Sequence, residues 1–111
     1  MMIPADVYRE FIKTGTAWAD AHCTASQLED QLKSMLAQIT IEAKEVDGVS
    51  SMTEAKEIAL SATMYRDAIR SAISARREAN VAKITYEATK SLFDAQRTAE
   101  ATERAATLAA P

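Results

Sequence analysis

The feature that most constrains this chain is a stretch of nearly sixty residues, from Ser51 to Ala109, without a single glycine or proline. Those two residue types destabilise the interior of a helix most, whereas the Ala, Glu, Arg and Lys that dominate the stretch favour one. The stretch therefore predicts one long helix over about 51–109, or two helices placed end to end.

The residues before this stretch predict a first long helix over about 5–46. Apolar or small residues recur there mostly three or four positions apart, as expected for one buried helical face. They are Phe11, Gly15, Trp18, His22, Ala25, Leu32, Leu36, Ile39, Ala43 and Val46. Ser26 followed by Glu29 has the spacing of a capping box, which leaves open a break near Thr24.

The connection between the two helices is predicted over about 47–50, where Asp47 and Gly48 form a strong turn signal. Gly48 fits a left-handed helix cap, and Ser51 with Glu54 forms a second capping box. Because a connection this short makes its helices antiparallel neighbours, we expect an all-α, coiled-coil-like helical hairpin. Residues 1–111 would form a single domain, with three helices if the long helix breaks near 76–80.

The apolar face of the long helix changes position along its length. In the first half Ile58, Ala62, Tyr65, Ile69 and Ala72 form a coiled-coil seam. In the second half an apolar stripe lies roughly 120° around the helix. It consists of Val81, Ile84, Ala88, Leu92 and Ala95. Either the helix bends over 76–80, or this stripe contacts a different partner, which predicts a homo-oligomer assembled as a helical bundle.

A second pattern in the same region combines cations with aromatic rings at spacings of three and four. Its members are Arg76, Lys83, Tyr86, Lys90, Phe93 and Arg97. Cations near phosphates and exposed rings that stack on bases are the two components of sequence-tolerant single-strand binding. The alternative is that Glu87, Asp94 and Glu100 neutralise the cations, while the two rings form a further oligomer contact.

Composition argues against several other classes of function. One His and one Cys, adjacent at His22 and Cys23, cannot complete a zinc site, so we expect no metal, cofactor, catalytic residue or small-molecule substrate. No apolar run reaches membrane-spanning length and the start lacks a signal peptide, so we expect a cytoplasmic protein without membrane contact. A single cysteine is typical of a reducing compartment.

Four segments resemble small all-helical proteins of tailed phages and prophages, from early genomic regions that also encode single-strand annealing and exonuclease functions. These segments are Trp18-Ala19-Asp20, Tyr65-Arg66-Asp67, residues 75–80 and residues 97–105. The resemblance implies a non-enzymatic accessory role in phage DNA recombination or replication within the host cytoplasm. The partner would be single-stranded DNA or a phage or host recombination protein, and no site residues are implied.

A rival interpretation keeps the same fold and assigns it to protein contacts alone. The first fifty residues carry a net charge of −4, against +1 for the remainder. An acidic helix of this kind suits a protein-interaction module that does not bind nucleic acid. Such a module would be a structural coiled coil or an inhibitor of a host protein.

Overall fold

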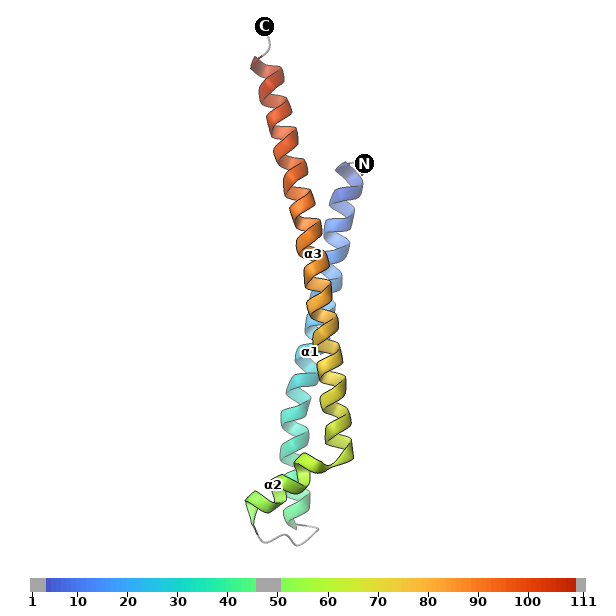
Figure 1. The fold of residues 1–111 in the computed structure, drawn as a ribbon, viewed down its shortest axis with the longest axis vertical. Helices are drawn as coiled ribbons and strands as arrows, with labels where there is room; N and C mark the ends of the chain where they lie inside the picture. The colour runs from blue at the N-terminus through green and yellow to red at the C-terminus, as the bar shows by residue number, and fades with distance from the viewer. Residues whose placement is uncertain (1–3, 46–50, 110–111) are drawn as a thin grey trace. The chain divides into compact units, whose positions relative to one another are not determined.

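The computed structural model describes residues 4–45 and 51–109, which form three helices (Figure 1). They are α1 (Pro4–Glu45), α2 (Met52–Ser61) and α3 (Thr63–Ala109). The described residues contain no strand, and α1 and α3 run in opposite directions, so the expected all-α helical hairpin is confirmed. The expected turn over 47–50, with its cap at Gly48, and Val46 at the end of the first helix lie outside the described residues.

The helices form two compact units. The first unit combines the start of α1, up to Asp20, with α3 from Asn80 onward. The second unit runs from Ala21 to Ala79 and contains the rest of α1, all of α2 and the start of α3. In each unit, therefore, the packing joins residues that are far apart in the sequence.

The start of α2 follows the capping pattern read from the sequence. Ser51 is the N-cap residue, with extended backbone angles, and its hydroxyl accepts a hydrogen bond of 3.1 Å from the backbone N–H of Glu54. This contact satisfies one of the N–H groups that a helix start leaves without a partner. The other capping pattern, at Ser26 and Glu29, does not begin a helix, because α1 continues through Thr24.

The long helical stretch is interrupted at Ala62, whose backbone is extended with φ −64° and ψ 133°. The N–H of Ala62 still donates to the carbonyl of Ala59 at 3.2 Å, and its own carbonyl accepts from the N–H of Arg66 at 3.0 Å. This residue thus ends α2 and precedes α3. In contrast, α3 is continuous through 76–80, so of the two alternatives left open by the sequence, a break there is absent.

The inward face of α3 repeats every seven residues. In the second unit it consists of Tyr65, Ala72 and Ala79, which are buried. In the first unit Tyr86 and Phe93 continue the same spacing and are partly buried. A strict seven-residue repeat keeps one seam of a helix against its partner, as in coiled coils. The apolar pattern of the sequence suggests that the seam moves around the helix after Ala72. In the structure the seam stays on the same face.

Small residues dominate the most buried positions of the second unit. Ala25 and Ala43 of α1 are buried, as are Ala55 and Ala59 of α2. Because the distance between packed helices depends on the side chains at the contact, alanines permit close approach. Among the larger side chains of the predicted seam, Tyr65 is buried and Ile69 is partly buried, whereas Ile58 is 39% exposed.

Candidate interaction surfaces

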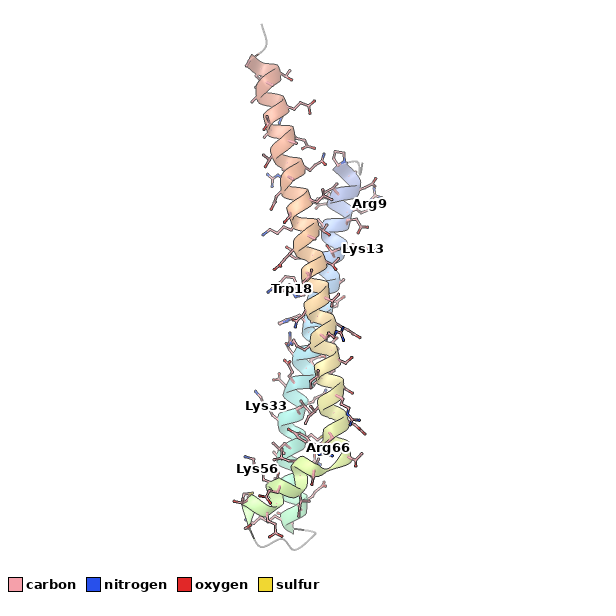
Figure 2. All side chains as sticks on the ribbon, viewed as in Figure 1. Arg9, Lys13, Trp18, Lys33, Lys56 and Arg66 are labelled. Atoms are coloured by element: carbon pink, nitrogen blue, oxygen red, sulfur yellow. The ribbon has the colours of Figure 1, made fainter. Side chains whose placement is uncertain are left out.

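An aromatic cluster joins α1 and α3 in the first unit. Phe11 stacks on Phe93 with ring centroids 4.8 Å apart, and it contacts Tyr86 at 5.5 Å. Trp18 lies 5.2 Å from Tyr86 and Tyr8 lies 6.1 Å from Phe93. Figure 2 labels Trp18, whose side chain lies against α3. The two rings predicted to stack on bases are thus packed within the hairpin.

Gly15 lets α1 approach this cluster closely. A Cβ atom at position 15 would lie 3.1 Å from Cε1 and 3.3 Å from Cδ1 of Tyr86. Both distances are shorter than ordinary carbon contacts of about 3.5–4.0 Å. The glycine that lowers the helix propensity of α1 is therefore the residue that makes room for the Tyr86 ring.

The cations of the predicted nucleic-acid surface border the aromatic cluster. Nζ of Lys83 lies 5.9 Å from the centre of the Trp18 ring. The guanidinium carbon of Arg97 lies 5.9 Å from the centre of the Phe93 ring. These distances fall within the range of cation–π contacts, which are weak at exposed sites. Lys90 is exposed on the same helix.

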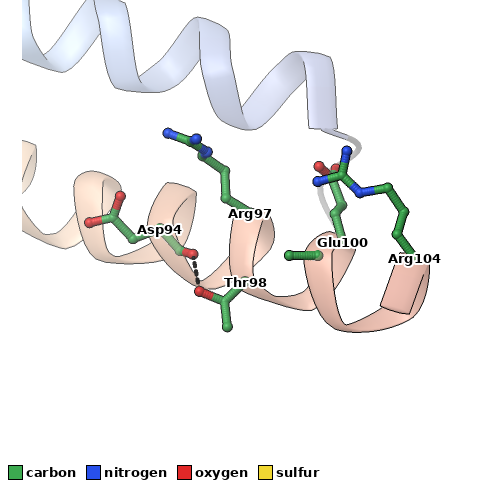
Figure 3. Close-up of a pocket in the computed structure, with 6 residues that line it drawn as sticks. Asp94, Arg97, Thr98, Glu100 and Arg104 are labelled. Atoms are coloured by element: carbon green, nitrogen blue, oxygen red, sulfur yellow. Dashed lines mark hydrogen bonds between the residues drawn. The ribbon is translucent and has the colours of Figure 1, made fainter. Parts of the chain in front are cut away.

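A shallow hollow of about 450 Å³ is lined by residues of α3 between Asp94 and Arg104. Its lining carries both signs of charge, with Asp94 and Glu100 beside Arg97 and Arg104. Figure 3 shows Arg97, Glu100 and Arg104 on the side of α3 that faces the start of α1. Because two carboxylates balance two guanidinium groups, this hollow offers no excess of positive charge to a phosphate.

Arg76, in the second unit, is held by three residues of α1. Its Nε and Nη2 donate to the two carboxylate oxygens of Glu29 at 3.0 Å and 2.6 Å, a bidentate ion pair. Its Nη2 also donates to the hydroxyl of Ser26 at 3.2 Å. Its Nη1 lies 2.9 Å from Nδ1 of His22 and donates to it in the tautomer that carries the ring hydrogen on Nε2.

This ion pair shifts the titration of both partners. The hydrogen bond from Arg76 lowers the pKa of Glu29 below its usual value, against the opposing effect of burial, and the charges of Arg76, His22 and Lys33 lower it further. The hydrogen bond with Glu29 raises the pKa of Arg76. The spacing of Ser26 and Glu29 that resembles a capping box thus places two groups that bind Arg76.

The Glu29 shift predicts acid sensitivity of the second unit. A carboxylate whose pKa is lowered by folding adds stability above its unfolded pKa, and this stability is lost as the pH falls through the folded value. We therefore expect Glu29→Gln to lower the urea midpoint at pH 7 but to have a much smaller effect at pH 3, as followed by circular dichroism. Glu42→Gln, an exposed carboxylate on the same helix, is the control. Equal effects of the two variants at pH 7 would contradict a stabilising role of the ion pair between Glu29 and Arg76.

The apolar stripe predicted on α3 is exposed in the first unit. The exposed fractions are 55% for Val81, 66% for Ile84 and 48% for Leu92. Ala88 and Ala95 are exposed as well. Three large aliphatic side chains on one helical face, left uncovered by the hairpin, are typical of a contact surface for another protein.

The described ranges 4–45 and 51–109 lack the features of two other classes of site, metal centres and membrane spans. No group of three or more His, Cys, Asp or Glu side chains there could hold a metal ion. None of the described helices is long and apolar enough to cross a membrane. Cys23 is exposed and forms no disulfide.

Comparison with known proteins leaves the chain without an assigned relative. Family models, curated proteins and solved structures give no significant match. The resemblance to phage proteins therefore stays a prediction.

The structure places the predicted nucleic-acid residues in different surroundings. Arg76 belongs to the second unit and is paired with Glu29, whereas the other five belong to the first unit. Among these five, Tyr86 and Phe93 are partly buried in the aromatic cluster and Lys83, Lys90 and Arg97 are exposed. Single-strand binding stays a prediction, now resting on the three exposed cations. Sequence reasoning missed Phe11 and Trp18 as partners of these rings, although both helices carry aromatic residues seven positions apart.

Proposed function

We propose that this protein is a non-enzymatic protein-interaction module that associates with a second copy of itself through the apolar stripe of α3. The observation that carries the proposal is the exposure of Val81, Ile84 and Leu92 on one helical face. Burying an aliphatic side chain of this size contributes about 1.5–3 kcal/mol when the burial is complete. A second copy presents the same stripe and would cover these side chains without any other component.

The expected assembly is reversible rather than permanent. Permanent interfaces bury large, mostly hydrophobic areas, whereas this stripe has three large side chains per copy. We therefore expect a dimer with a Kd on the order of 10 µM or weaker. A hairpin that pairs reversibly suits a structural or adaptor role better than a role in binding small molecules.

Sedimentation equilibrium over a wide range of protein concentration tests the proposal. We expect the wild-type chain to dimerise, and Ile84→Asp to raise the Kd by at least about tenfold because a carboxylate would have to be desolvated at the contact. Ala101→Asp adds the same charge at an exposed position on the opposite side of α3 and should leave the Kd unchanged. A wild-type chain that stays monomeric, or two variants that behave alike, would refute the proposal.

The nucleic-acid hypothesis can be examined in the same experiment. A single-stranded oligonucleotide added at low salt would cosediment with the protein if Lys83, Lys90 and Arg97 form a binding surface. Such binding would weaken steeply with salt and be lost on reversing the charges of Lys83 and Lys90. Cosedimentation that meets both conditions would favour accessory DNA binding over a module for protein contacts alone.

A further inference from the structure

The spacing within the apolar stripe is the same when read from either end. Val81, Ile84, Ala88, Leu92 and Ala95 are separated by three, four, four and three residues, so the pattern is symmetric about Ala88. Homodimers with two-fold symmetry use the same patch on both copies, and residue i of one copy contacts residue j of the other. A symmetric stripe meets this requirement when the two helices run in opposite directions.

We infer that two copies pair through antiparallel α3 helices, with the two-fold axis at Ala88; this inference rests on the self-association proposed above. In this register Ile84 lies level with Leu92 of the second copy, and Val81 lies level with Ala95. Ala88 meets Ala88 at the centre, where crossing helices are closest and a small side chain is needed. Each large side chain of the stripe thus faces either a small one or one of similar size.

Disulfide crosslinking of single-cysteine variants tests the register. The variants are made on a Cys23→Ser background, and the Kd of each is checked by sedimentation before mild oxidation. We expect Ala88→Cys to crosslink with itself, because the two residues meet on the axis. Ile84→Cys should not crosslink with itself, because the two positions lie about 12 Å apart along the antiparallel pair. Disulfides require Cα atoms within about 7 Å.

The decisive sample is a mixture of Ile84→Cys and Leu92→Cys chains. We expect the mixed dimer, identified by its mass, to form at least ten times faster than either like dimer. Parallel helices would give the opposite result, with Ile84→Cys and Leu92→Cys each crosslinking with itself. A chain that dimerises but gives none of these crosslinks would refute the register, whereas the absence of any dimer would refute the proposed self-association.

Discussion

Replacing Phe11 with alanine is expected to lower the free energy of unfolding of the first unit by about 2–3 kcal/mol. Removing a fully buried phenylalanine ring costs about 3–5 kcal/mol, and Phe11 is only partly buried. Its ring nevertheless contacts both Tyr86 and Phe93, so one substitution removes two of the ring contacts between α1 and α3. Urea unfolding followed by circular dichroism and by Trp18 fluorescence measures the loss, at concentrations below those that favour dimers.

The neighbouring residue provides a matched control. Ile12 is 48% exposed on the same turn of α1, and surface substitutions usually change stability by less than about 0.5 kcal/mol. Ile12→Ala should therefore leave the urea midpoint almost unchanged. If Ile12→Ala and Phe11→Ala lowered it equally, the aromatic cluster would not be what holds the two helices together.

Replacing Gly15 with leucine is the second large effect that we expect. Helix propensity alone would stabilise α1 by nearly 1 kcal/mol, since glycine is among the poorest helix formers. The leucine side chain would, however, have to occupy space that the Tyr86 ring fills, beginning with a Cβ only 3.1 Å from Cε1 of that ring. The ring cannot move freely, because Phe11 and Trp18 both contact it. We expect a net loss of about 2 kcal/mol, a typical cost of overpacking.

Thermal unfolding of three variants separates the two contributions. Ala17→Leu inserts the same side chain at an exposed position of α1 and should have little effect. The unfolding temperature of Gly15→Ala should fall between those of the wild-type chain and Gly15→Leu, because its single methyl group contacts the Tyr86 ring without displacing it far. A more stable Gly15→Leu would show that helix propensity outweighs packing at this position.

Much of the fold follows from local sequence signals. The absence of glycine and proline after Ser51 predicts a long helical stretch, and the antiparallel hairpin follows from the short connection. The exposed aliphatic stripe was also predictable, because Val81, Ile84 and Leu92 share a helical face that differs from the face of Tyr65 and Ala72. Periodicity and turn chemistry act within a few residues, so one sequence is enough to read them.

The aromatic rings show where such reading fails. The spacing of Tyr86 and Phe93 predicts that both rings lie on one face of α3. It does not predict which residues cover that face. Their partners, Phe11 and Trp18, lie at the other end of the sequence and become neighbours only through the hairpin. The same holds for Arg76, because its partner Glu29 lies 47 residues away in the sequence and becomes a neighbour only in the folded chain.

The interruption at Ala62 has no comparable sequence signal. Alanine is the best helix former, so propensity gives no reason to end a helix there. The hydroxyl of Ser61 contributes, because it donates to the carbonyls of Glu57 and Ile58 and so competes for backbone groups at the end of α2. Packing of Ala55 and Ala59 into the second unit then positions α2 separately from α3.

This interruption separates the cooperative unfolding of α2 from that of α3. Isolated helices shorter than about 12–15 residues are marginal in water, and α2 has 10 residues. Since its helical hydrogen-bond ladder ends at Ala62, α2 gains no stability from propagation along α3. Its buried contacts are the methyl groups of Ala55 and Ala59, so it can melt locally while α1 and α3 stay paired. Helix α2 is thus the part of the described fold whose conformation can change with the smallest loss of packing.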